Sequence, residues 1–383
     1  MALHFEPSEL AARRDKTIAA MTAEGFDGLL IFRQESMYYL TGYDTFGYVF
    51  FQCLYLGADG TITLLTRSAD LRQARHTSVI EDVRIWVDGP DAMPAEDLRA
   101  MLDGHGCKGR RLGVEWESYG LTARNGQRLQ AALEGFCQLG DASELVSRLR
   151  VVKSAAEIAY VRRAAELADD AYRAAVAGTR AGAAEGDILA DMQGAIFRGG
   201  GDYPGNEFII GSGRDALLCR YFSGRRALDK ADQLTLEWAG AYRHYHAAMM
   251  RTFVVGDVPA RQRRMFDVSL EALEAVKQAV RPGNTFGDAF DAHTDVIDAA
   301  GMSEHRLNAC GYSLGTTFAP NWMDWPMLYH ANPVAFEPGM VVFCHMIIFD
   351  SDAGLAMTLG ETVLVTEHGH DRLSSAPLEL VVK

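Results

Sequence analysis

Apolar positions in the first part of the chain follow two periods. GLLIF at 28–32 and TITLLT at 61–66 have the length of buried strands, and the turn signal Ala58-Asp59-Gly60 precedes the second. Apolar residues at helical spacing lie between such runs, from Pro7 to Gly25 and again over 95–104 and 124–134. Alternation of strands and helices predicts a small α/β domain over residues 1–147.

The pattern changes near residue 149. From Leu149 to Gly178 the chain is rich in Ala, Glu and Arg and has no Pro or Gly before Gly178, which predicts one long amphipathic helix. Further helices are expected over 185–197 and 260–280. Strand-like runs follow at 233–240, 244–256, 340–349 and 361–367. Residues 148–383 are therefore predicted to form an α+β domain whose strands carry the chemistry.

Charge and composition limit the classes of binding partner that we expect for this protein. The 383 residues include 37 Lys+Arg and 51 Asp+Glu, a formal net charge of −14, with no basic stripe. Nucleic acids and anionic membranes both require neutralisation of phosphate charge, so neither is expected as a partner. A small-molecule substrate fits better.

Cysteine usage and the N-terminus point to a compartment. The six cysteines are scattered without a C-x-x-C pair, which favours a reducing environment. The first 21 residues lack the apolar core of a secretory signal. Every uncharged stretch, 45–58 among them, is shorter than the ~20 apolar residues of a membrane helix. We expect a cytoplasmic protein.

The sequence gives little support for the motifs of several common classes of enzyme. The glycine clusters at 199–201 and 211–213 form neither a phosphate loop nor a complete dinucleotide fingerprint. The spacing Gly-x-Ser-x-Gly occurs once, at 311–315 (GYSLG), but no helix is predicted to follow it, as a nucleophile elbow requires. No cysteine lies in a nucleophile motif. Serine and cysteine hydrolase mechanisms are therefore disfavoured.

Polar residues gather instead in two predicted strands. In HYHAAMMRTF, His244, His246, Ala248 and Met250 share one face because side chains alternate across a strand. Glu237 is a lone carboxylate in an otherwise apolar strand, and needs a partner or a function if it is buried. A structural carboxylate remains an alternative.

A resemblance to a known family extends over nearly the whole chain. It is carried by the ordered segments 251–256 (RTFVVG), 311–315 (GYSLG), 338–341 (PGMV) and 361–365 (ETVLV). These resemble the pita-bread fold of methionine and Xaa-Pro aminopeptidases, prolidase and creatinase. The segments 39–43 (YLTGY) and 149–154 (LRVVKS), with Glu157-Ile158, resemble the two-domain creatinase/prolidase subgroup. The resemblance implies a pita-bread C-terminal domain, a creatinase-like N-terminal α/β domain, and a homodimer.

The chain departs from the metallopeptidases of this fold at their ligand positions. Those enzymes hold two divalent ions with two Asp, one His and two Glu. The matching positions here are Glu237, Ala248, Tyr312, His345 and Gly360. Ala and Gly have no ligating side chain, and Tyr rarely binds these ions. We therefore expect no metal and no other cofactor. A single ion held by Glu237, His345 and His246 is the alternative.

Within the family, the chain looks most like the metal-free ectoine hydrolases. Creatinase's substrate-binding carboxylates fall on Met250 and His345, and its base histidine falls near Arg225, so a creatine pocket is not expected. The ectoine hydrolase pattern is similar at 237–240 (EWAG), 245–246 (YH), 251–252 (RT), 311–315 and 320–322 (PNW). That resemblance makes Glu237 the nucleophile. Departures at 323–326 and at His345 leave the substrate open.

Roles for the remaining residues follow from the chemistry. Cleavage of a C–N bond requires a nucleophile or activated water, a proton donor to nitrogen and a group that stabilises developing charge. We expect Glu237 in the first role, as nucleophile or base. The other catalytic candidates are His246 or His345 as the proton donor and Tyr312 as the stabilising group.

Substrate contacts are expected from a cation and an aromatic loop. Arg220 replaces the cleft histidine of the aminopeptidases and is expected to bind a substrate carboxylate, with an internal salt bridge as the alternative. Trp322, Trp325 and Tyr329 are expected to wall a pocket or a subunit contact, or else to be core residues. Asp324 is expected to meet a cationic amidine, and His244 is a further substrate contact.

The sequence thus predicts a metal-independent hydrolase of a C–N bond in a small carboxylated amidine or amide. An Xaa-Pro dipeptidase or aminopeptidase with a rebuilt metal site is the enzymatic alternative, and a non-catalytic pita-bread binding module is the other. Polar residues retained at the cleft positions favour an enzyme. The remaining histidines are expected at the surface or at helix ends; they are His4, His76, His105, His293, His305, His368 and His370.

Overall fold

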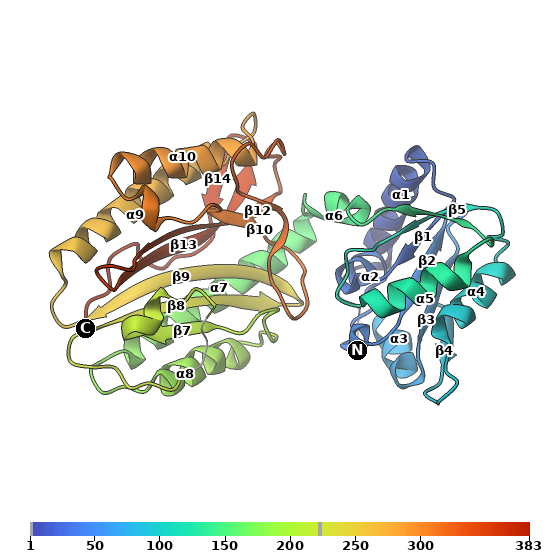
Figure 1. Cartoon of the computed structure of the whole chain (residues 1–383), viewed down its shortest axis with the longest axis horizontal. Coiled ribbons are helices and arrows are strands. Elements are labelled where there is room, and N and C mark those ends of the chain that lie inside the picture. The colour runs from blue at the N-terminus through green and yellow to red at the C-terminus, as the bar shows by residue number, and fades with distance from the viewer. Residues whose placement is uncertain (1–2, 221–223) are drawn as a thin grey trace. The chain divides into compact units, whose positions relative to one another are not determined.

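The computed structural model describes residues 3–220 and 224–383 (Figure 1). The chain divides into two compact units, with the boundary between Arg150 and Val151. This boundary lies three residues after the predicted one, which fell between residues 147 and 148. Among the described residues, no helix has the length and apolar character needed to cross a bilayer. All six cysteines are free thiols.

The first unit is built on a six-stranded sheet with the order β4-β3-β2-β1-β5-β6. Its strands are β1 (Gly28–Ile31), β2 (Cys53–Gly57), β3 (Ile62–Arg67), β4 (Asp82–Trp86), β5 (Arg111–Val114) and β6 (Gln138–Asp141). Its helices are α1 (Pro7–Ala23), α2 (Gln34–Thr41), α3 (Leu71–Thr77), α4 (Pro94–Gly104), α5 (Ala123–Leu133) and α6 (Leu145–Arg150). The hairpin expected around Ala58-Asp59-Gly60 is present as the antiparallel pair β2–β3.

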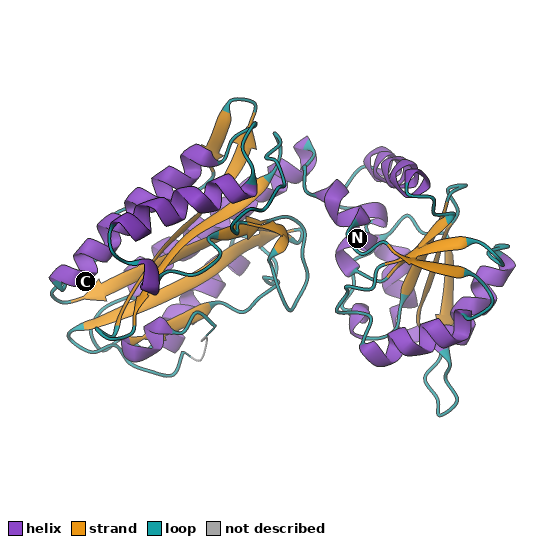
Figure 2. Cartoon of the chain, turned by 45° about the horizontal axis from the view of Figure 1, so that its top comes forward, coloured by secondary structure: helices purple, strands orange, loops and turns teal. Residues whose placement is uncertain are grey.

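Helices cover both faces of this sheet, as Figure 2 shows. Leu30 on β1 packs in one apolar cluster with residues of α4 and α5. Its neighbours Leu29 and Ile31 pack in another cluster, with residues of α1 and α2. A strand buried on both faces is apolar at every position, which explains the continuous run GLLIF.

The second unit contains an eight-stranded antiparallel sheet with the order β11-β10-β12-β13-β9-β8-β7, and β14 pairs with β13. Its strands are β7 (Ile209–Ser212), β8 (Asp232–Tyr242), β9 (Tyr245–Val255), β10 (Gly311–Ser313), β11 (Asp324–Met327), β12 (Val341–Asp350), β13 (Leu355–Thr366) and β14 (Gly369–Arg372). The helices are α7 (Ala155–Gly178), α8 (Glu185–Arg198), α9 (Ala260–Ala279) and α10 (Phe286–Ala299).

Two helix predictions need correction. The single helix expected from Leu149 is two helices, because α6 ends at Arg150 and α7 starts after Ser154. Ser154 and Glu157 form a capping box that fixes this start. Helix α10 was not predicted, although Thr285 and Asp288 form a capping box before it. That Thr-x-x-Asp spacing was a readable signal in the sequence.

Helices α7 and α9 pack on the same face of the second sheet. Trp238 on β8 donates its indole N–H to the Ala168 carbonyl of α7 at 2.9 Å. Gly240 allows α7 to approach this closely, since a Cβ there would lie 1.9 Å from the Ala164 carbonyl oxygen. Residues that alternate with these along β8 therefore point to the opposite face.

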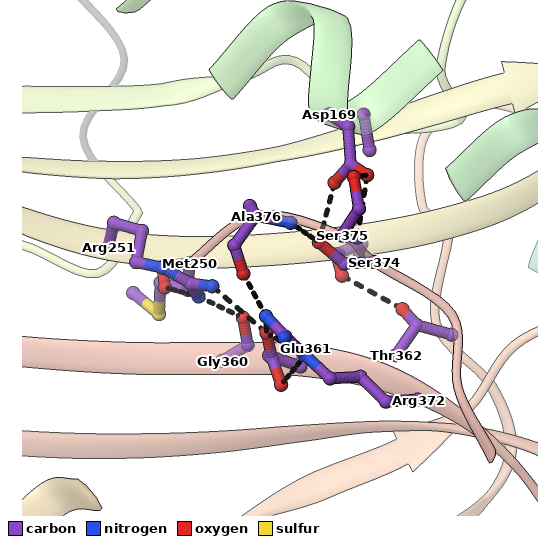
Figure 3. A network of polar contacts seen from close by, with 12 residues as sticks. Asp169, Met250, Arg251, Gly360, Glu361, Thr362, Arg372, Ser374, Ser375 and Ala376 are labelled. Atoms are coloured by element: carbon purple, nitrogen blue, oxygen red, sulfur yellow. Dashed lines mark hydrogen bonds and ion pairs between the residues drawn. The ribbon is translucent and has the colours of Figure 1, made fainter. Parts of the chain in front are cut away.

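A polar network on the helix-covered face ties β9, β13 and the C-terminal segment together (Figure 3). Glu361 is fully buried and pairs with Arg251 at 3.1 Å and with Arg372. Asp169 on α7 accepts hydrogen bonds from Ser374 and Ser375. These contacts are structural, because the alternation of β9 and β13 turns them away from the face that carries Glu237.

Candidate active site

A single row of residues crosses four neighbouring strands on the uncovered face. Glu237 on β8 lies opposite Met250 on β9, Met250 lies opposite Gly360 on β13, and Gly360 lies opposite His345 on β12. Tyr312 on β10 lies opposite Phe343, two residues from His345 and on the same face. The register thus brings together residues that are more than 100 positions apart in the chain.

Glu237 is 9% exposed and accepts a hydrogen bond from the Tyr312 hydroxyl at 3.3 Å. Burial raises the pKa of its carboxyl to about 7, while the Arg220 charge and the Tyr312 hydrogen bond act in the opposite direction. A carboxyl with a pKa near neutrality exchanges protons readily at physiological pH, as acid–base and nucleophilic catalysis require.

Tyr312 and Trp322 continue the hydrogen bonding from Glu237. The indole N–H of Trp322 donates to the Tyr312 hydroxyl oxygen at 2.8 Å. Burial raises the pKa of Tyr312 well above its ordinary value, so the phenol stays protonated and donates. Trp322 is 2% exposed. Its side chain lies next to Tyr312 as a buried donor, and this burial fits the core alternative considered for it.

His246 uses both ring nitrogens for hydrogen bonds within the protein. The backbone N–H of Gly205 donates to its Nε2 at 2.8 Å, and its Nδ1 lies 3.0 Å from the Thr317 hydroxyl. Burial lowers its pKa to about 4, which keeps the ring neutral. This arrangement leaves no nitrogen for the proton-donor role considered above, and we reassign His246 to holding the loops at Gly205 and Thr317.

His345 remains available for proton transfer. Its ring centroid lies 5.6 Å from that of Tyr312, and its buried Nδ1 has no hydrogen-bond partner among the described residues. Burial lowers its pKa to about 3, helped by nearby His293 and Arg220. His293 itself is 1% exposed, on α10, so its expected place at the surface or a helix end was wrong.

The strand prediction for His244 was also wrong. Arg243 and His244 form the two-residue turn between β8 and β9, where Tyr242 pairs with Tyr245. Both turn residues have positive φ, 50° and 65°, as the tight turns of hairpins require. His244 therefore lies outside the strand, and its ring stacks on Phe318 with 4.2 Å between centroids.

The other predicted substrate contacts differ in their surroundings. Arg220 is exposed, and its charge acts on Glu237, Tyr312 and His345. Trp325 is partly buried against the core of the second unit, which is the alternative considered for it.

Asp324 lies in a different setting. Its Oδ2 and the Lys153 Nζ both lie near the place of a Cβ on Gly315, at 3.3 and 3.5 Å. A protein cation is thus already close to this carboxylate, which weakens the expectation that Asp324 meets a cationic substrate.

The described residues do not fit a peptidase-type metal centre. No group of three or more His, Cys, Asp or Glu side chains in 3–220 and 224–383 is arranged to hold an ion. At Gly360, where relatives carry a ligand, a Cβ would lie 2.8 Å from the Phe343 ring and 3.1 Å from the Met250 Cβ. Apolar side chains therefore fill the space next to Glu237 that a second carboxylate would need.

Phe343 and Met250 were not recognised as contributors to the site. Strand alternation was a usable signal for Phe343, which lies two residues before His345. Met250 was placed on the correct face, but its position between Glu237 and Gly360 depends on the order of the strands.

Comparison with known proteins identifies the family of this chain. Residues 159–367 match metallopeptidase family M24, and residues 13–152 match the creatinase/prolidase N-terminal domain. The chain belongs to metallopeptidase family M24. The predicted pita-bread fold and two-domain architecture are confirmed.

Two relatives match over the whole length. The ectoine hydrolase of Halomonas elongata is 28% identical, with 100% of this chain and 99% of the relative aligned. An uncharacterised hydrolase/peptidase of Sinorhizobium fredii is 30% identical over 100% of this chain and 99% of its own. A solved prolidase from Thermococcus sibiricus superposes with a TM-score of 0.88 at 21% identity, covering 97% of this chain and 99% of that one. This M24 chain is a hydrolase acting on C–N bonds.

Proposed function

We propose that this M24 protein is a metal-independent hydrolase that cleaves a C–N bond in a small carboxylated amidine or amide. The observation that carries the proposal is the buried Glu237 carboxyl, with its pKa raised to about 7, in a row whose other members are Met250, Gly360 and His345. This row supplies one titrating carboxyl and no second carboxylate. It suits direct chemistry by the carboxyl better than coordination of two ions.

The remaining groups supply the other parts of the reaction. Ionised Glu237 attacks the amidine or amide carbon, or removes a proton from the attacking water. The Tyr312 hydroxyl, which points to Glu237, stabilises negative charge as it develops. His345 is the candidate that passes a proton to the departing nitrogen. As a neutral ring it stores no proton, and it relays to that nitrogen a proton that comes from water. When Glu237 itself attacks, water then hydrolyses the bond between Glu237 and the substrate carbon.

Arg220 determines the kind of substrate in this proposal. The exposed guanidinium, whose charge reaches Glu237, supports a role for Arg220 in binding a substrate carboxylate near the reacting carbon. The ectoine hydrolase relative supports a cyclic amidine acid as the first compound to test. A cytoplasmic homodimer acting on a small molecule, without nucleic acid or membrane, remains part of the proposal.

The test is Glu237→Gln assayed on ectoine, guanidino acids, N-acyl amino acids and Xaa-Pro dipeptides. Gln keeps the shape of the side chain and accepts the Tyr312 hydrogen bond but carries no charge. We expect kcat to fall by ~10²–10⁴-fold or more. Glu367→Gln, in the exposed turn after β13, is the matched control and should retain activity.

Two results would overturn the proposal. One is full turnover by Glu237→Gln in a folded protein. The other is stoichiometric Mn, Co or Zn in the purified protein, with Xaa-Pro cleavage that chelation abolishes, which would establish the dipeptidase alternative.

A further inference from the structure

A directed series of hydrogen bonds ends at the Glu237 carboxyl. It starts at the Gly205 backbone, passes through His246 and Thr317, and reaches the loop that carries Trp322. From there the Trp322 indole contacts the Tyr312 hydroxyl at 2.8 Å, and that hydroxyl contacts Glu237 Oε1 at 3.3 Å.

The direction of each bond follows from the donor groups. A backbone N–H only donates, so His246 Nε2 must accept from Gly205 and the ring proton must lie on Nδ1. That proton is donated to Thr317, whose own hydroxyl proton is left for the Trp322 carbonyl at 3.5 Å, a long contact. His246 thereby anchors the loop on which Trp322 is mounted.

The Trp322 indole sets the direction of the hydrogen bond between Tyr312 and Glu237. An indole N–H has no acceptor capacity, so the Tyr312 oxygen must accept from Trp322. The single Tyr312 proton is then free to point at Glu237. With the indole N–H removed, the hydroxyl could rotate and place its proton elsewhere.

We propose that Trp322 is a positioning residue, which orients the Tyr312 hydroxyl toward Glu237 through its indole N–H. The inference rests on the proposed function, because it assigns Trp322 a part in the same reaction. Trp322 acts only through Tyr312 and does not contact the substrate. The Tyr312 hydrogen bond favours the charged form of Glu237, so its loss makes the carboxyl harder to ionise.

The kinetic test is a double-mutant cycle between Trp322→Phe and Tyr312→Phe, with ectoine as the first probe. Trp322→Phe should lower kcat roughly tenfold, the value of one hydrogen bond, with little change in KM. The rising limb of its pH profile should move to higher pH. In the Tyr312→Phe background the same substitution should have no further effect on kcat. Trp86→Phe, which removes an indole N–H bonded to the Phe51 carbonyl in the first unit, is the control.

A spectroscopic test does not depend on turnover. The chain has five tryptophans, so isotope-labelled protein gives five indole N–H signals, and Trp322→Phe identifies one of them. Tyr312→Phe should shift that signal upfield because the indole loses its acceptor.

The outcomes separate the two proposals. An unchanged Trp322 signal in Tyr312→Phe overturns the positioning role. The same roughly tenfold fall in kcat on Trp322→Phe in the Tyr312→Phe background also overturns it. Full turnover by Glu237→Gln overturns the proposed function instead, and leaves the indole signal responsive to Tyr312.

Discussion

Glu237→Gln should make the protein more stable at neutral pH, while it removes activity. The pKa of Glu237 is about 7 in the folded protein, against an ordinary value of 4.5. Between these pH values the unfolded chain has lost this proton and the folded protein still holds it. The free energy of unfolding must therefore fall as the pH rises from 4.5 to 7, and stay level above 7.

The magnitude follows from the two pKa values. Their difference of about 2.5 corresponds to about 3 kcal/mol, at about 1.4 kcal/mol per pKa unit. Replacing the carboxyl by a neutral amide of the same shape removes this cost. For a unit of this size, a gain of about 3 kcal/mol raises the melting temperature by roughly 6–12 °C.

The assay is the melting temperature of wild type and variant from pH 4 to pH 9. Below the ordinary pKa the two proteins should melt alike. The gap should open toward pH 7 and then remain constant. Glu367→Gln, an exposed carboxylate, should show no such gap. A Glu237→Gln protein that melts several degrees below wild type across the whole range would show a structural carboxylate paired in the core, and would refute this reasoning.

Three further predictions concern the packing around the row. Gly360→Ala should cost about 1–3 kcal/mol of unfolding free energy, because its Cβ would lie 2.8 Å from the buried Phe343 ring; urea unfolding should show partial recovery with Phe343→Leu, and purely additive losses would contradict the contact. Glu361→Gln should cost about 3–5 kcal/mol, because Arg251 stays buried without its counter-charge; a variant as stable as wild type in the same assay would disprove that pairing. Chelation should leave activity unchanged, and elemental analysis of the purified protein should show less than one transition metal per chain. Loss of activity on chelation that added metal restores would contradict the conclusion that apolar packing at Gly360 leaves no room for a metal ligand.

The sequence by itself determined the elements that follow from local periodicity. The strands predicted at 233–240 and 340–349 and the helices predicted over 185–197 and 260–280 could be placed because burial on one face imposes a period of two or 3.6. Glu237 could be singled out because burying a carboxylate in an apolar strand costs free energy, so the residue is expected to have a catalytic function or a polar partner. The order of short motifs indicated the fold and the two-domain architecture.

The tertiary structure decided which of the candidate residues share a site. The row from Glu237 to His345 depends on strand order, since β8 and β12 are neighbours only through β9 and β13. His246 was a candidate proton donor by its type, but its two nitrogens are taken by Gly205 and Thr317, which lie far from it in sequence. Hydrogen-bond partners and steric contacts, such as Phe343 over Gly360, depend on distances of a few ångströms between strands. Local periodicity carries no information about those distances.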